Sequence, residues 1–166
     1  MSSVYYGNQE RKLDYKGRIG IPDDLTALGD AWSRAVLVRA SEELAESDPF
    51  PCLFLYDVER WQELLYAADR EQDMDGNEKR LFMHKVVADA ATLDVDAMKR
   101  ITIPQRLLEH AGIQRQEPVR VLGMFNHIEI WNPIVYATYM GVMEGLEVPV
   151  PSLFDLARRA TVRAVG

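Results

Sequence analysis

Short segments of alternating apolar and polar residues run through most of the chain and predict strands rather than long helices. Ile19 and Ile21 alternate with smaller residues, as do Ile101 and Ile103, and a proline follows each pair. These positions predict two short strands, each ended by its proline. Further strands are expected at residues 11–14, 35–39, 52–56, 92–95, 119–122 and 127–131.

Helical spacing of apolar residues appears between these strands. The prolines favour a first helical turn, so short helices are expected at residues 22–28 and 104–111, the second closed by Gly112. Asp57 and Asn132 are good helix N-caps, and each precedes an apolar stripe that we expect to pack in the core. The turn signal at residues 75–77 predicts a linking helix at 78–88, and Ser152 can cap a last amphipathic helix. The two stripes comprise Val58, Trp61, Leu64, Leu65 and Ala68, and Val135, Tyr139, Val142 and Met143.

The same succession of elements occurs twice. Residues 18–22 read Arg-Ile-Gly-Ile-Pro and residues 100–104 read Arg-Ile-Thr-Ile-Pro, so four of five positions match at a spacing of 82. Asp14 and Asp96 match at the same spacing. The block at 52–57 matches 127–132 at a spacing of 75, which places seven extra residues in the first copy, at 41–48. The chain is therefore a tandem duplication.

The repeat predicts the domain organisation. Neither copy has enough strands to close a barrel alone, whereas two copies together can bury both apolar faces. We expect an α+β fold, mainly β, in which the two repeats form one pseudo-symmetric domain. The expected parts are a first repeat with its helix at 5–75, the linking helix at 76–88, a second repeat with its helix at 89–146, and a C-terminal amphipathic tail at 147–166.

Charge is distributed unevenly along the chain. The net charge of −7 and the pI near 5.0 argue against a nucleic-acid partner when taken alone. Residues 23–78 carry a net −11, however, whereas residues 1–22 and 79–166 each carry +2. Two mildly basic regions therefore remain available for DNA.

Composition limits the other kinds of chemistry. No apolar run reaches membrane-spanning length and the N-terminus lacks a secretion signal, so a soluble cytoplasmic protein without a membrane partner is expected. A single cysteine, Cys52, excludes an internal disulfide and a cysteine-cluster zinc site. His84, His110 and His127 lack metal-ligand spacing, and we expect them at the surface or as caps. No metal site or small-molecule substrate is expected.

The spacing Asp-x-x-x-Arg before an Ile-x-Ile-Pro strand, present twice, strongly resembles the twin AbrB-type modules of the MraZ family of bacterial transcriptional regulators. The resemblance covers about residues 5 to 145. It implies a double-split, swapped-hairpin β-barrel with flanking helices, and assembly into a ring-like homo-oligomer. It also implies binding to repeated promoter elements ahead of the cell-wall and cell-division gene cluster, hence association with the nucleoid, and it implies no cofactor and no catalytic activity.

The residue types in this motif suit contact with double-stranded DNA. Asp14 precedes Arg18 by four positions, so its carboxylate can hold the guanidinium in a bidentate pair or accept loop N–H groups. Asp96 and Arg100 repeat the arrangement. An oriented arginine can contact phosphate oxygens or a guanine edge, whereas the alternative is a surface turn with a weak salt bridge. Additional phosphate contacts are expected from Arg11, Lys12, Lys16 and Lys99.

The two loops differ at two matching positions. Gly17 can take the positive φ of a tight turn, whereas Lys99 stands at its counterpart and must either bear that strain or reshape the second loop. Met98 stands where the first loop has Lys16. We therefore expect the first loop to be the sharper sequence reader and the second loop to act more as a phosphate anchor.

Sequence features also bear on two function classes other than a DNA-binding regulator. An enzyme is disfavoured because the chain has no glycine-rich phosphate loop or nucleophile elbow, and Glu42, Glu43 and the acids at 73–75 have nothing to raise their pKa values. The alternative is an assembly or protein-interaction module of the same fold that does not bind DNA, such as an antitoxin-like relative whose C-terminal helix docks on a partner. The net charge, Lys99 and the apolar stripe at 153–160 favour this alternative.

Overall fold

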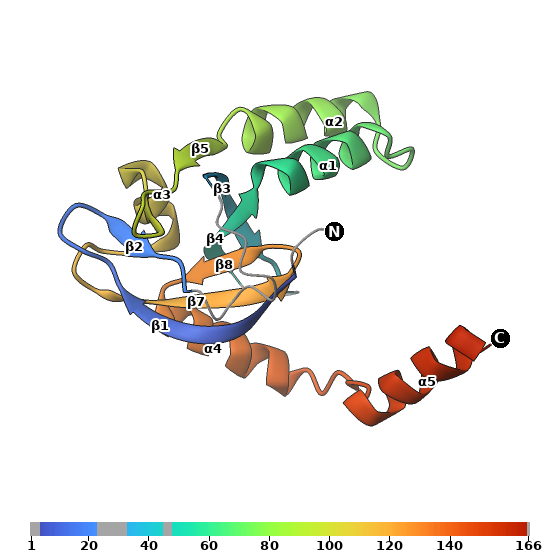
Figure 1. Ribbon diagram of the computed structural model, residues 1–166. Helices are drawn as coiled ribbons and strands as arrows, with labels where there is room; N and C mark the ends of the chain where they lie inside the picture. The colour runs from blue at the N-terminus through green and yellow to red at the C-terminus, as the bar shows by residue number, and fades with distance from the viewer. Residues whose placement is uncertain (1–3, 23–32, 45–47, 166) are drawn as a thin grey trace. The chain divides into compact units, whose positions relative to one another are not determined.

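The computed structural model describes residues 4–22, 33–44 and 48–165 (Figure 1). The chain forms two compact units, Met1–Tyr136 and Ala137–Gly166. The described strands are β1 (Tyr5–Lys12), β2 (Arg18–Gly20), β3 (Arg34–Glu42), β4 (Phe50–Asp57), β5 (Ala91–Asp94), β6 (Arg100–Thr102), β7 (Pro118–Phe125) and β8 (Ile128–Trp131). The described helices are α1 (Val58–Asp69), α2 (Gly76–Phe82), the π-helix η2 (Met83–Val87), α3 (Gln105–Ala111), α4 (Pro133–Gly145) and α5 (Leu153–Val165).

Six strands form one antiparallel sheet that interleaves the two repeats. Its strand order is β1-β7-β8-β4-β3-β5. The first strand of each repeat pairs with the third strand of the other, because β1 pairs with β7 and β5 pairs with β3. The α+β fold with antiparallel pairing is thus confirmed. The described ladders leave β1 and β5 at the edges of an open sheet, and they close no barrel.

A second, two-stranded sheet joins the repeats through their isoleucine strands. β2 pairs with β6 in antiparallel register, with Ile19 opposite Ile101. Both isoleucines are buried in a core cluster to which both repeats contribute, together with Leu13, Ile103 and Leu107. Burial of each of these side chains stabilises the folded state by about 1.5–3 kcal/mol. The short strands β2 and β6 are therefore anchored in one core that the two repeats share.

Most helix boundaries follow from the predicted caps. Asp57 accepts a hydrogen bond from the Arg60 N–H at 2.8 Å, and Asn132 accepts one from the Ile134 N–H at 2.8 Å. Gly112 ends α3 in the left-handed conformation, as expected. Ser152 Oγ accepts from the Asp155 N–H at 3.1 Å at the start of α5. The helix expected at 22–28 lies outside the described residues.

The linking helix lies within the expected range 76–88: it begins at Gly76, where Asp75 is its N-cap and forms a capping box with Glu78, and it ends as a π-helix over Met83–Val87. One prediction for the helix that follows β8 was wrong. In α4 the expected core stripe is not buried. The first compact unit ends at Tyr136, whose ring contacts that of Trp131 at a ring-centroid distance of 5.4 Å.

Within the described part of the chain, no helix is long and apolar enough to cross a membrane.

Gly123 allows the closest approach of β1 to β7. A Cβ built there would lie 2.2 Å from the Tyr6 backbone nitrogen, a separation that real atoms do not reach. The strand exchange between the repeats therefore depends on a missing side chain.

We expect Gly123→Ala to lower the free energy of unfolding by about 3 kcal/mol, because overpacking against rigid backbone cannot be relieved by a rotamer change. Gly20→Ala is the matched control, since a Cβ there meets nothing within 4 Å, and it should change stability by less than about 1 kcal/mol. Urea denaturation followed by circular dichroism measures both. Equal stability of the two variants would contradict this role of Gly123.

Candidate nucleic-acid interface

The first loop, residues 14–18, is organised by a single carboxylate. Oδ1 of Asp14 accepts hydrogen bonds from the N–H groups of Lys16 at 2.9 Å and Arg18 at 2.8 Å. Oδ2 accepts from Nε of the Arg18 guanidinium at 2.6 Å. The Gly17 N–H donates to the Asp14 carbonyl at 3.1 Å and closes the turn. One aspartate thus shapes the backbone and orients the arginine.

The second loop, residues 96–100, repeats this network. Oδ1 of Asp96 accepts from the N–H groups of Met98 and Arg100, both at 2.9 Å. Oδ2 accepts from Nε of Arg100 at 2.9 Å. The Lys99 N–H donates to the Asp96 carbonyl at 2.9 Å, as Gly17 does in the first loop. The two loops therefore have matching hydrogen bonds despite their different sequences.

Lys99 bears the strain that its position imposes. Its φ is 59°, and that of Gly17 is 79°, so both residues are in the left-handed region. For a residue with a Cβ this conformation costs about 1–2 kcal/mol. Of the two outcomes expected for the second loop, the structure has the strained one, and the loop keeps the shape of the first.

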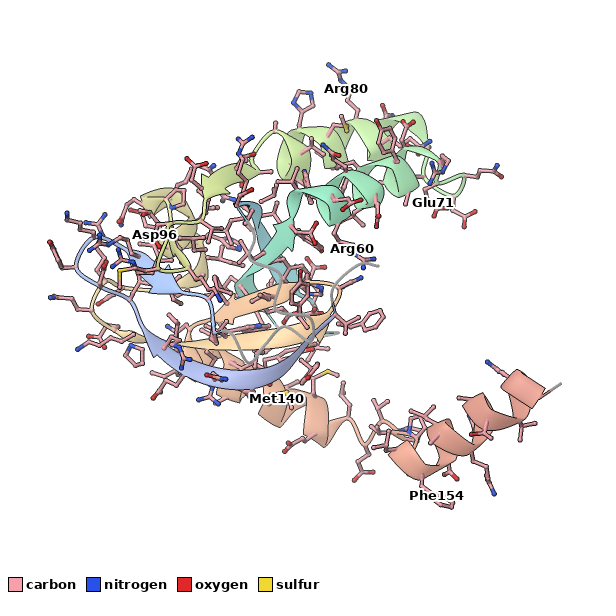
Figure 2. All side chains as sticks on the ribbon, in the orientation of Figure 1. Arg60, Glu71, Arg80, Asp96, Met140 and Phe154 are labelled. Carbon is pink, nitrogen blue, oxygen red and sulfur yellow. The ribbon has the colours of Figure 1, made fainter. Side chains whose placement is uncertain are left out.

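Two reciprocal backbone hydrogen bonds hold the loops side by side. The Ile103 N–H donates to the Gly17 carbonyl at 2.9 Å, and the Ile21 N–H donates to the Lys99 carbonyl at 2.8 Å. Between them runs the β2–β6 ladder, which places Gly20 opposite Arg100. Figure 2 shows Asp96 of the second loop beside β2, in agreement with these bonds. The motifs, 82 residues apart in sequence, thus form one paired element.

The guanidinium groups of Arg18 and Arg100 are oriented by the aspartates, which bind only their Nε atoms. The bond to each aspartate is made through Nε alone, so the bidentate pair is not formed and the loop N–H groups take the other carboxylate oxygen. Arg18 and Arg100 keep 27% and 30% of their side-chain surface exposed. Among the described residues, no Nη atom of either arginine has a hydrogen-bond partner. These donors are available to a ligand.

Both aspartates are stabilised in their charged form. Desolvation raises the pKa of Asp14. Hydrogen bonds from the loop N–H groups and from the Arg18 guanidinium together lower the pKa by more than desolvation raises it, so the pKa lies below the ordinary 3.8. In Asp96 the largest cause is the Arg100 N–H, and its pKa also lies below 3.8. The arginines therefore face a permanent negative charge at neutral pH.

The side chains of Arg11, Lys12 and Lys16 lie near the first loop, outside the hydrogen bonds that the Asp14 carboxylate accepts. Lys16 is exposed, with Nζ 5.6 Å from the ring centroid of Tyr15. Arg11 and Lys12 end β1 just before the first loop, and Nη1 of Arg11 donates to the Glu10 carbonyl at 3.0 Å. Whether any of these side chains contacts DNA remains a prediction.

One cation beside the first loop was missed by the sequence reasoning. Nε of Arg115 would lie 3.6 Å from a Cβ at Gly17. Arg115 belongs to the turn after α3, in the other repeat, and no motif marks it. No local sequence signal could have found it, because the strand exchange brings these segments together.

A second polar cluster, separate from the two loops, lies around the buried side chain of Glu129. Glu129 is buried, and its carboxylate accepts from Nε1 of Trp131 at 2.8 Å and contacts Nε2 of His127 at 2.9 Å. His127 packs on Phe54 and Tyr56, with centroids at 4.3 and 5.4 Å, so its expected place at the surface was wrong. The alternation of apolar and polar residues in the sequence predicts one exposed face for this strand, whereas all residues of β8 are buried. The sequence pattern therefore does not indicate that the adjacent His127 packs against other rings.

The expectation that nothing raises the pKa of Glu42 was also wrong. Glu42 lies in β3, where desolvation and the nearby Glu129 charge raise its pKa. Burial also raises the pKa of Cys52, so its thiol is a poor nucleophile. Within the described ranges, no group of three His, Cys, Asp or Glu side chains could hold a metal ion.

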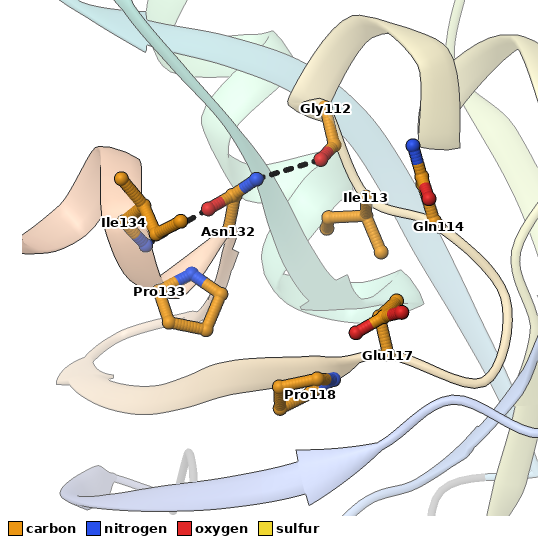
Figure 3. A pocket seen from close by; sticks show the side chains of 8 residues that line it. All are labelled: Gly112, Ile113, Gln114, Glu117, Pro118, Asn132, Pro133 and Ile134. Carbon is orange, nitrogen blue, oxygen red and sulfur yellow. Dashed lines mark hydrogen bonds between the residues drawn. The ribbon is translucent and has the colours of Figure 1, made fainter.

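A shallow pocket of about 220 Å³ lies between the end of α3 and the start of α4 (Figure 3). Nδ2 of Asn132 donates to the Gly112 carbonyl across it at 2.7 Å. Glu117 is the one ionisable residue among those lining it. The pocket therefore offers no acid–base pair for catalysis.

We expect Lys99→Gly to raise the free energy of unfolding by about 1 kcal/mol, because it removes the left-handed strain while the loop keeps its hydrogen bonds. Gly17→Ala should lower it by about as much, since an added Cβ there meets only ordinary contacts beyond 3.4 Å and the cost is conformational. Urea denaturation compares the variants. Destabilisation by Lys99→Gly would show that the lysine side chain contributes more than the strain costs.

The depressed pKa values predict a pH dependence. A carboxylate whose pKa is lower in the folded state than in the unfolded state stabilises the fold above the unfolded value, and this contribution is lost as the pH falls through the folded value. We therefore expect part of the stability to disappear as the pH falls below 3.8. Asp14→Asn with Asp96→Asn keeps an Oδ1 acceptor and removes both charges, so the slope below this pH should be shallower than in the wild type. Parallel slopes in urea titrations from pH 5 to 2.5 would contradict the assignment.

Comparison with known proteins places this geometry in a family. The model of the family described as "MraZ protein, putative antitoxin-like" matches residues 86–145. The Transcriptional regulator MraZ of Acetivibrio thermocellus is 30% identical over 139 residues, which cover 83% of this chain and 87% of that protein. The protein of the same name from Bacteroides fragilis is 35% identical over 130 residues, covering 76% of each chain. That from Thermoanaerobacter pseudethanolicus is 30% identical over 133 residues, covering 80% of this chain and 84% of its own length.

The matches to these relatives cover 76–83% of the chain, a longer stretch than residues 86–145 matched by the family model. The chain belongs to the MraZ family.

Proposed function

We propose that this protein is a sequence-specific regulator of transcription that binds double-stranded DNA through its two Asp–Arg loops. Its targets are repeated promoter elements of the cell-wall and cell-division gene cluster, and it acts in the cytoplasm at the nucleoid. It has no catalytic activity and needs no cofactor. The relatives from Acetivibrio thermocellus and Bacteroides fragilis are each named a transcriptional regulator, which supports this role.

The observation that carries the proposal is the pairing of the loops. Arg18 lies opposite Thr102 and Arg100 lies opposite Gly20 in one ladder. Strand geometry then separates their Cα atoms by about 7 Å along the strands and about 5 Å across them. The DNA major groove is about 12 Å wide, so both guanidinium groups can enter one groove. An isolated surface salt bridge would need no such duplication.

The aspartates make the arginines suitable for base recognition. Holding Nε fixes the plane of the guanidinium and leaves Nη donors for guanine O6 and N7 or for phosphate oxygens. Part of the ordering cost of a long side chain is then met before DNA binds. Each carboxylate is turned toward its own loop by three hydrogen bonds, which limits its repulsion of DNA phosphates.

The overall charge makes assembly part of the proposal. A subunit with a net charge of −7 has few cations to spare for DNA. Several subunits engaging repeated elements can raise the avidity by about 10²–10⁴ without any new contact. We therefore propose that the protein acts as a ring-like homo-oligomer, and that the two repeats of each subunit work together as one swapped-hairpin barrel.

The two loops are proposed to play unequal parts. Their backbones match, so the difference lies in the side chains: Lys16 in the first loop is replaced by Met98 in the second, and Gly17 by Lys99. The first loop, with an exposed lysine beside Arg18, is the better candidate for base reading. The second is the better candidate for a phosphate anchor.

A second candidate function rests on α5. Leu153 and Phe154 are 82% and 75% exposed, and Arg158, Arg159 and Arg163 follow on the same helix. A helix of this composition suits docking on a protein partner, as in an antitoxin-like assembly module that does not bind DNA. A toxin-like gene adjacent to this one would favour that function, and a cell-division cluster downstream would favour the regulator.

We expect Arg18→Ala to weaken binding to the gene's own upstream DNA by about 1–3 kcal/mol per engaged site and to relax discrimination at the contacted base. Arg100→Ala should weaken all sequences alike and reduce the salt slope by about 1, as a phosphate contact does. Gel-shift titrations at several salt concentrations, with the upstream duplex and a scrambled one, measure both. Unchanged binding by both folded variants would refute the proposed interface.

A further inference from the structure

Arg115 is displayed at the tip of a strained turn. The Glu117 N–H donates to the Gln114 carbonyl at 3.3 Å, which closes a four-residue turn between α3 and β7. Gln116, at its third position, has a φ of 66°, a conformation that glycine or asparagine would adopt more easily. Strained turns of this kind gather at functional sites. Arg115 itself is exposed.

The turn is fixed to the first loop. The Leu13 N–H, one residue before Asp14, donates to the Glu117 carbonyl at 3.1 Å. Nε of Arg115 would lie 3.6 Å from a Cβ at Gly17, so the guanidinium lies against the face of the loop that has no side chain. A shallow groove along α3, lined by Gln105, Gln114 and Arg115 among others, continues from this point.

Arg115 also differs from three arginines of the loops and the neighbouring strand β3. Arg18, Arg34 and Arg100 each form an ion pair with an aspartate. Among the described residues, the Arg115 side chain has no ion pair and no hydrogen bond to another residue. The Arg115 guanidinium is therefore not neutralised by a described carboxylate. Such a group can bind a phosphate bidentately.

Among the described residues, the second loop has a matching anchor, the bond from the Val95 N–H to the Ser33 carbonyl at 2.9 Å. Two positions before Glu117 the sequence has Arg115, whereas two positions before Ser33 it has Ala31, which carries no charge. The sequence therefore supplies a cation close to the anchor of the first loop and none at the matching position of the second.

We propose that Arg115 is a further DNA-binding residue, which contacts a backbone phosphate next to the position read by Arg18. This inference rests on the proposed function and adds a residue from the second repeat to the first loop. Lys16, Arg18 and Arg115 then form a set of three cations around Gly17. The phosphate contact fixes how the first loop sits on the duplex, which is how backbone contacts support base reading.

The test measures DNA affinity by fluorescence anisotropy for the full-length wild type, Arg115→Gln, Arg115→Lys and Arg18→Ala. Arg70→Gln is the control for loss of one positive charge, since Arg70 is exposed at the end of α1. Its neighbour Glu71 lies well away from Asp96 in Figure 2. The probes are a duplex from the gene's upstream region and a scrambled duplex of equal length, each at four salt concentrations.

We expect Arg115→Gln to weaken binding to both duplexes by about tenfold and to reduce the salt slope by about 1. Arg115→Lys should recover most of the slope, and Arg70→Gln should stay within about twofold of the wild type. Arg115→Gln within twofold of the wild type, while Arg18→Ala loses binding, would overturn this inference and leave the proposed function intact. Equal effects of Arg115→Gln and Arg70→Gln would overturn it as well. Absence of binding by the wild type would refute both.

Discussion

The two backbone hydrogen bonds that cross between the loops are the constraint on which the interface depends. They join Gly17 to Ile103 and Lys99 to Ile21, and they require each motif to lie beside the strand of the other. Because Ile19 and Ile101 are buried between the repeats, the pairing is supported by the core and not by exposed contacts. Neither loop can then take up its position without the other repeat. The carboxylate networks of Asp14 and Asp96 act within this frame and orient one arginine each.

The same constraint explains how an acidic chain can present a cationic surface. Strand exchange brings the lysines and arginines of residues 11–18 close to those of residues 99–100. Arg115, from a turn of the second repeat, lies beside the first loop. Much of the negative charge of residues 23–78 belongs to a segment that includes α1 and the start of α2. Net charge therefore describes solubility and non-specific attraction, whereas recognition depends on where a few charges are held.

The sequence was sufficient for local structure and for the motif. The isoleucine strands, the caps at Asp57 and Asn132 and the Asp–Arg pairs were all predictable, because each depends on residues close together in the chain. The pairing of β1 with β7 was not, since repeats with the same pattern are compatible with exchange or with separate sheets. The place of Arg115 and the packing of His127 against Phe54 were missed for the same reason, as their surroundings come from distant segments. Lys99 was recognised as strained, but which of two outcomes it takes depends on the bonds that hold its loop.

Both loops are proposed to face DNA together, and site-specific photo-crosslinking distinguishes this arrangement from contact by a single loop. A benzophenone amino acid replaces Tyr15 in the first loop or Met98 in the second, two exposed side chains that carry no charge, and Tyr66 on α1 is the control. On irradiation with the upstream duplex, we expect crosslinks to DNA from positions 15 and 98 and none from position 66. Crosslinking from only one loop, or from position 66 alone, would contradict it.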